Sequence, residues 1–120
     1  MNKHLIEATN LHTTACFLLD NIKEENLHLT EILNQLETGE HEPILYCCMK
    51  QIFIENHCEI FKLIESIESI CKFDLNEDIK EELDSVNKEL QILRDSCAEL
   101  EEKITPYLFC PALHEREENN

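Results

Sequence analysis

The segment from residue 79 to residue 104 limits the fold of this chain more than any other feature, because apolar side chains recur in it every third or fourth residue without a break. That spacing follows the α-helical repeat, so these side chains gather on one narrow stripe of a helix. The stripe consists of Ile79, Leu83, Val86, Leu90, Leu93, Cys97, Leu100 and Ile104. The segment therefore predicts a helix over about residues 75–104 that packs on other helices along its whole length, as in a coiled coil.

Two further segments, about residues 4–37 and 43–72, show a similar spacing and predict two more helices. The first carries Ala8, Leu11, Ala15, Leu18, Ile22, Leu29, Ile32 and Leu36, and the second carries Ile60, Leu63, Ile64, Ile67, Ile70 and Cys71. Gly39 is expected to end the first helix, and Pro43 suits the first turn of the second. Asp74 and Glu77 have the spacing of a capping box for the third helix, and Pro106 prevents its continuation.

One glycine and three prolines in 120 residues leave too few turns for a sheet of several strands. Three long helices with short connections predict an all-α fold, an elongated antiparallel three-helix bundle with coiled-coil-like packing. If the polar region from Asn21 to Asn26 breaks the first helix, the bundle has four helices. We expect one domain over residues 1–113, including a short apolar segment at 106–113, and a charged, flexible tail at 114–120.

The start of the second predicted helix, ILYCCMKQIFI at residues 44–54, is apolar around most of its circumference. A helix on the surface of a globular domain needs only one apolar stripe, so another segment must cover the remaining side. In an antiparallel bundle the apolar segment 106–113 emerges beside this helix start. Either that segment or a partner protein is expected to cover it, and the candidate partner-binding residues are Leu45, Cys48, Met49, Ile52, Tyr107 and Phe109.

The third helix offers a second candidate binding surface at Leu83, Leu90 and Leu93. Its apolar stripe is narrower than the core of a single chain usually requires. We therefore expect these leucines to pack on helices of another protein or of a second copy, which would make the protein a homo-oligomer.

The formal net charge of −16, from 26 acidic and 10 basic residues, excludes whole classes of partner. Such a charge repels phosphate backbones and anionic lipid, so neither a nucleic acid nor a membrane is an expected partner. A basic protein is favoured instead. An alternative function is that of an acidic decoy, in which the carboxylates of the third helix occupy a basic nucleic-acid-binding surface of another protein.

The cellular compartment is predicted from the chain start and the cysteines. The first ten residues, MNKHLIEATN, lack the apolar core of a signal peptide, and no apolar run is long enough to span a bilayer. The seven cysteines are odd in number and lie mostly on apolar helical faces, as expected of reduced thiols. These features predict an intracellular, cytoplasmic protein, with the nucleus as a second possible location.

A zinc-stapled bundle is a further alternative. His41, Cys47, Cys110 and His114 could converge at one end of the bundle, and zinc binds mixed sets of thiolates and imidazoles. Structural zinc sites usually contain a Cys-x-x-Cys pair, however, and this sequence has none. We therefore expect no metal and no cofactor.

Two short arrangements resemble reactive sites without completing one. Glu25 and His28 have the Glu-x-x-His spacing of di-iron bundles, with Glu25 at a seam position, but those sites require the motif twice. His57 and Cys58 are adjacent, so on a helix they point about 100° apart and cannot act as base and nucleophile. Phosphate-binding loops and nucleophile-elbow motifs are also missing, so no enzymatic activity is expected.

The leading functional prediction is a non-catalytic protein–protein interaction module that binds partner helices, as an adaptor or as a small helical subunit. In its small size, acidity and helix content the chain is similar to export chaperones and to helical subunits of larger assemblies. That similarity is one of composition.

Helical spacing and an odd cysteine number lead to a direct test. We expect circular dichroism to show a helical spectrum without a strand component, and a thiol titration under denaturing, non-reducing conditions to find all seven cysteines reduced. Substantial strand content, or a thiol count well below that number, would contradict this prediction.

Overall fold

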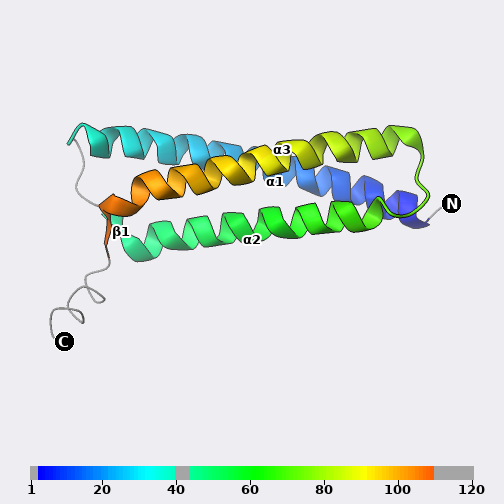
Figure 1. Ribbon diagram of the computed structural model, residues 1–120, viewed down its shortest axis with the longest axis horizontal. Helices are drawn as coiled ribbons and strands as arrows, with labels where there is room; N and C mark the ends of the chain where they lie inside the picture. Colours follow the sequence, from blue (N-terminus) through cyan, green and yellow to red (C-terminus); the bar gives the residue numbers. More distant parts are fainter. Residues whose placement is uncertain (1–2, 40–43, 110–120) are drawn as a thin grey trace, which may run out of the picture.

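The computed structural model describes residues 3–39 and 44–109 of the chain. Three long helices lie side by side along an elongated molecule of 62 × 32 × 17 Å (Figure 1). They are α1 (Lys3–Glu37), α2 (Tyr46–Ile70) and α3 (Glu77–Ile104). α1 and α3 run in the same direction and α2 runs against them (Figure 1). The predicted all-α antiparallel three-helix bundle is confirmed, and α1 continues through Asn21 and Asn26 without a break.

α1 ends where the sequence predicts. Gly39 has a φ of +77°, a left-handed conformation that glycine adopts without the steric cost of a Cβ. The Gly39 amide donates to the Leu36 carbonyl at 3.1 Å, and the Thr38 amide donates to the Asn34 carbonyl at 3.1 Å. Carbonyls of the last turn are therefore satisfied within the chain.

The start of α3 differs from the prediction. The capping residue is Asn76, whose side-chain Oδ1 accepts from the Ile79 amide at 2.9 Å, so the proposed Asp74–Glu77 capping box is wrong. Leu75 precedes the helix and is buried in the core. Because Leu75 packs in the core before the helix begins, the N-cap lies at Asn76, two residues later than the capping-box pattern indicates.

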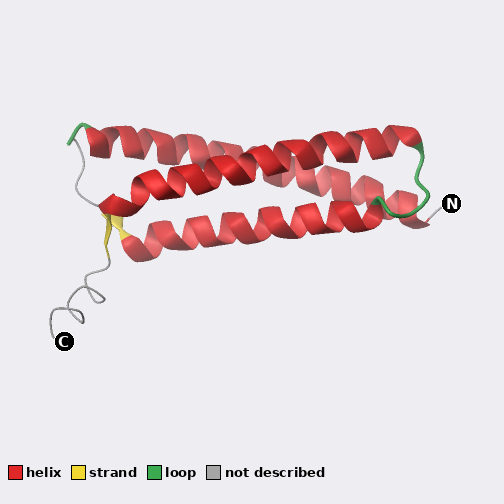
Figure 2. Cartoon of the chain, viewed as in Figure 1, coloured by secondary structure: helices red, strands yellow, loops and turns green. Residues whose placement is uncertain are grey.

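Two very short strands lie at the end of the bundle where α2 begins and α3 ends (Figure 2). β1 (Ile44–Leu45) pairs in parallel with β2 (Leu108–Phe109), and a single 3-10 turn, η1 (Thr105–Tyr107), connects α3 to β2. This pairing was not expected from the sequence. Because residues 44 and 45 are extended, α2 starts at Tyr46, three residues after the predicted start.

The strand pair brings the segment after α3 back to the start of α2, as the sequence suggested. The side chains of Tyr107 and Leu108 are half-buried and pack on the core there, and Ile52 of α2 packs on the same cluster. The remainder of the predicted apolar segment, residues 110–113, and the predicted tail at 114–120 lie outside the described residues. Part of the cover for the start of α2 therefore comes from the chain itself.

The core consists of two apolar clusters that follow each other along the bundle. The first comprises Ala8, Ala15, Leu19, Ile22, Ile60, Leu63, Ile64, Ile67, Ile70, Leu75, Ile79, Leu83, Val86, Leu90, Leu93 and Cys97. The second, at the end with the two strands, comprises Leu29, Leu33, Met49, Phe53, Leu100 and Ile104.

Polar side chains separate the two clusters. Asn26 of α1 is half-buried, and its Nδ2 donates to the Cys97 Sγ of α3 at 3.1 Å. Asn56 of α2 is 5% exposed, and its Nδ2 has no hydrogen-bond partner within the described part of the chain. The expectation that Glu25 occupies the seam is wrong, because Glu25 is exposed and Asn26 takes the inward position. We call Asn26 and Asn56 the polar layer; Cys97, which Asn26 contacts, belongs to the first apolar cluster.

The strand pair predicts that the segment after α3 stabilises the bundle. Removal of residues 106–120 should lower the melting temperature by roughly 5 °C, because it exposes the apolar surface that Tyr107 and Leu108 cover. Binding of a hydrophobic dye should increase at the same time. Removal of residues 111–120 alone keeps β2 and serves as the control. If both truncated proteins melt like the full chain, the segment contributes no cover.

Candidate functional site

The three leucines predicted to bind a partner through α3 lie inside the bundle. Leu83 and Leu90 are 0% exposed and Leu93 is 5% exposed, and all three belong to the first apolar cluster. α1 and α2 therefore fill the α3 stripe. Leu93 also lines a hollow between α1 and α3, but the three leucines expose too little surface to bind a partner by themselves.

The candidate residues at the start of α2 have mixed positions. Met49 is buried, Ile52 and Tyr107 are half-buried, and Cys48 is exposed. Leu45 and Phe109 are register partners in the strand pair, although the structure does not describe their side chains.

The structure does not describe the side chains of the predicted zinc ligands. His41, Cys110 and His114 are outside the described residues, and the side chain of Cys47 is not described. Within residues 3–39 and 44–109, no group of three or more histidine, cysteine or acidic side chains could hold a metal ion.

The cysteines near basic groups do not form an activated thiolate. Cys16 lies 3.6 Å from His12 Nε2, but partial burial and the nearby Asp20, Glu89 and Glu82 carboxylates raise the pKa of its thiol. Burial likewise raises the pKa of Cys97. Because the thiolate is the reactive form, both thiols are poorly suited to nucleophilic chemistry. All five cysteines whose side chains are described are free thiols.

A charged cluster joins α2 to α3. Glu101 Oε2 accepts from Lys50 Nζ at 2.8 Å, and Glu101 Oε1 lies 3.2 Å from His57 Nε2. These contacts, the hydrogen bond from Lys50 above all, lower the pKa of the Glu101 carboxyl. His57 is therefore directed at α3 and not at its neighbour Cys58, which is exposed. We assign this Glu101 cluster a structural role, because its groups meet one another across the two helices.

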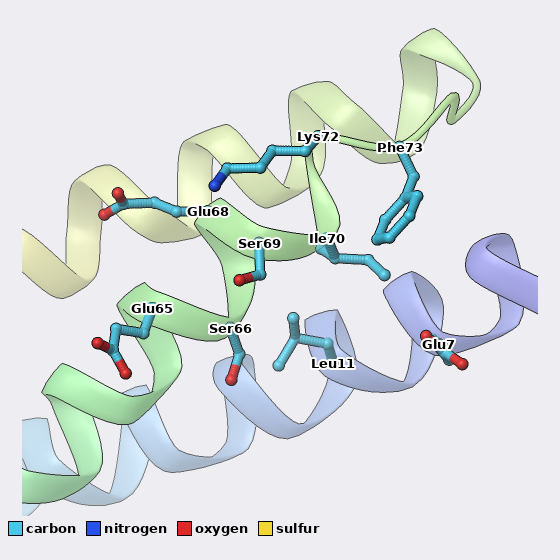
Figure 3. A pocket seen from close by; sticks show the side chains of 9 residues that line it. All are labelled: Glu7, Leu11, Glu65, Ser66, Glu68, Ser69, Ile70, Lys72 and Phe73. Carbon is cyan, nitrogen blue, oxygen red and sulfur yellow. The ribbon is translucent and has the colours of Figure 1, made fainter.

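The feature best suited to binding is a groove between α1 and α2. Its larger hollow, of about 660 Å³, lies at the end of the bundle where α1 starts and α2 ends (Figure 3). Leu11, Ile70 and Phe73 give it an apolar surface, while Glu7 of α1 and Glu65 and Glu68 of α2 supply carboxylates around it. Ser66, Ser69 and Lys72 complete the lining.

The aromatic side of this hollow is held in place by a ring contact. Phe73, in the connection between α2 and α3, stacks on His4 of α1 with ring centroids 3.8 Å apart and an interplanar angle of 10°. Phe73 nevertheless stays 45% exposed. The stack therefore fixes the connection against α1 and leaves aromatic surface available to a ligand.

A second hollow, of about 390 Å³, lies farther along the same two helices. It is lined by Leu29 of α1 and Ile52 of α2, with Asn21, Glu24, Glu25 and His28 of α1. Glu25 and His28 therefore do lie together, on the rim of this hollow and without a second copy of their motif. We call the two hollows together the α1–α2 groove.

The charge of the α1–α2 groove is strongly negative. Its lining includes five glutamates and one lysine, namely Glu7, Glu24, Glu25, Glu65, Glu68 and Lys72. Of the predicted partner-binding residues whose side chains the structure describes, only Ile52 lines it. Sequence analysis missed the remainder because the groove forms between two helices whose relative rotation the apolar spacing of each helix does not give.

No protein-family model, no curated protein and no solved structure matches this chain. Among the described residues, no helix is both long enough and apolar enough to cross a membrane.

The lowered pKa of Glu101 predicts a pH dependence of stability. A carboxyl whose pKa is lower in the folded state stabilises that state above its unfolded pKa, here near 4.5, and loses this contribution as the pH falls through the folded pKa. Glu101→Gln should therefore lower the free energy of unfolding by about 1 kcal/mol at pH 7 and by less at an acidic pH below the folded pKa of Glu101.

Thermal melts of both proteins across this pH range provide the measurement. Glu102→Gln is the matched control, because Glu102 is exposed and has no ion pair in the described part of the chain. An equal loss for Glu101→Gln at both pH values would show that its effect is not electrostatic.

Proposed function

We propose that this protein is a non-catalytic interaction protein whose α1–α2 groove binds a helix of a partner protein. The observation that carries the proposal is that apolar side chains and carboxylates line the same two hollows along two neighbouring helices. A partner helix recognised in this way lays its apolar face into the groove between two helices. Bound there, it would convert the three-helix bundle into a four-helix bundle.

The charge of the groove defines the chemistry of the partner. Five glutamates against one lysine favour a helix that carries lysine and arginine on both sides of an apolar stripe. The net charge of −16 on the whole chain adds long-range attraction for such a basic segment. An adaptor or a small subunit of a larger assembly would use the groove in this manner.

The acidic decoy is less well supported than helix binding. The predicted decoy needs carboxylates of α3 that imitate a row of phosphates, whereas three of them, on Asp84, Glu89 and Asp95, already form ion pairs with basic side chains of this chain. Apolar contacts contribute affinity that salt does not screen, and a phosphate mimic would lose most of its affinity in salt.

The proposed location is a reducing compartment inside the cell. Five free thiols, two of them on the exposed residues Cys48 and Cys58, support this proposal, because disulfides form and persist mainly in oxidising compartments.

A synthetic helical peptide tests the groove. The probe is a peptide of about 20 residues with a leucine stripe flanked by lysine and arginine, measured by fluorescence anisotropy against the full chain. Glu65→Lys/Glu68→Lys reverses two groove charges and should weaken binding by about tenfold. Glu81→Lys/Glu102→Lys changes the net charge equally at exposed positions that line neither hollow and should have a much smaller effect.

A second peptide separates helix binding from charge attraction. It keeps every lysine and arginine and replaces the leucine stripe by alanine, so it should bind weakly and be released by salt. If both peptides bind equally well, or if both double variants weaken binding to the same extent, the proposed groove is wrong and binding reflects net charge alone.

A further inference from the structure

We propose that a second copy of this chain packs on the face where α1 and α3 lie side by side. Two hollows of about 310 Å³ and 180 Å³ lie there, and both are lined by Asn26 and Ser96. They therefore form one continuous depression, which we call the α1–α3 groove. Leu33, Leu93 and Leu100 contribute apolar surface to it. The groove is separate from the α1–α2 groove, and this inference does not depend on the function proposed above.

Exposed aliphatic side chains stand on both rims of the α1–α3 groove. Ile92, on the α3 rim, is 67% exposed. Leu27 is 64% exposed and lies on α1 between Lys23 and Thr30, which both line the groove. Because these three residues are spaced by four and three positions, they form one stripe of the helix. A protein that binds here with an apolar surface would bury both Leu27 and Ile92.

The charge of this face favours a second copy as the occupant. Two lysines and two glutamates line the groove, Lys23, Lys103, Glu89 and Glu99, so its lining is neutral although the chain carries a net charge of −16. Two copies repel each other over most of their surface and meet with least repulsion on a neutral face. A basic partner would gain more from the strongly acidic α1–α2 groove.

The arrangement of charges on α3 is self-complementary. Glu89 and Lys103 lie seven residues before and seven residues after Ser96, and all three line the groove. In a symmetric pair, a two-fold axis at Ser96 makes the two α3 helices antiparallel and places Glu89 of each copy opposite Lys103 of the other. The small side chain of Ser96 allows close approach at the axis. Ile92 then faces the region of Leu100 in the second copy.

The size of the contact predicts a weak, reversible dimer. From Glu89 to Lys103 the helices extend about 21 Å, and two helices side by side are about 20 Å wide, which gives roughly 400 Å² on each copy. A stable complex usually buries about 800 Å² on each partner. We therefore expect a dissociation constant in the micromolar range, on the order of 10 to 100 μM.

Sedimentation velocity of the full chain tests this proposal. At an ionic strength of about 150 mM and protein concentrations from about 1 to 500 μM, the wild type should shift from monomer to dimer. Ile92→Glu should remain monomeric across this range. Phe17→Glu is the matched control, because Phe17 is 66% exposed on α1 and lines neither hollow, and it should dimerise like the wild type.

Charge exchange tests the antiparallel arrangement. Glu89→Lys places like charges opposite Lys103 of the second copy and should raise the dissociation constant by about tenfold, whereas Glu89→Lys/Lys103→Glu restores opposite charges and should return it close to the wild-type value. Glu89 also lies 3.8 Å from Lys23 of its own chain. Both variants lose that contact. A return of the dissociation constant to the wild-type value in the double variant therefore reflects the contact between copies.

Three results would overturn the inference. A wild type that stays monomeric at the highest concentration removes the dimer. A dimer that Phe17→Glu weakens as much as Ile92→Glu places the interface on another face. A double variant that dimerises no better than Glu89→Lys removes the antiparallel pairing around Ser96.

Discussion

Burial of the narrow apolar stripe of α3 is the constraint on which the remaining structure depends. Eight apolar or thiol side chains on α3 are buried, although most other side chains of that helix are polar. Such a stripe is covered completely only when one helix lies on each side of it. α1 and α2 therefore pack more extensively on α3 than on each other. The hollows between α1 and α2 are accordingly larger than those between α1 and α3.

The polar layer limits how the three helices can be arranged. The Nδ2 of the buried Asn56 has no hydrogen-bond partner in the described part of the chain, so its burial makes folding less favourable. In other helical assemblies a single inward asparagine selects one register, because every other register leaves it in an apolar layer. Here Asn26 finds a partner in Cys97 only when α1 and α3 are aligned as observed. The layer therefore favours this alignment over shifted ones.

The helices could be predicted from the sequence because each carries its own periodic signal, and Gly39 marks the end of α1 with a conformation that few other residues adopt. The features that sequence analysis missed or misplaced depend on contacts between segments. Leu75 is buried in the core and does not join the helix, so the N-cap is Asn76. The α1 seam passes through Asn26 because Cys97 lies opposite. The α1–α2 groove follows from the rotation of two helices about a third, which no local pattern contains.

The parallel strand pair has a consequence for the order in which the chain folds. Ile44 and Leu108 are neighbours although roughly 60 residues separate them, and closing a flexible loop of that length is entropically unfavourable. Once α2 and α3 have docked as an antiparallel hairpin, the two segments already lie at the same end of the bundle, and most of that loss has occurred. The pairing of β1 with β2 is then a late event. The strand pair joins the two ends of the α2–α3 hairpin and so closes it into a loop of chain. α1 is not part of that loop.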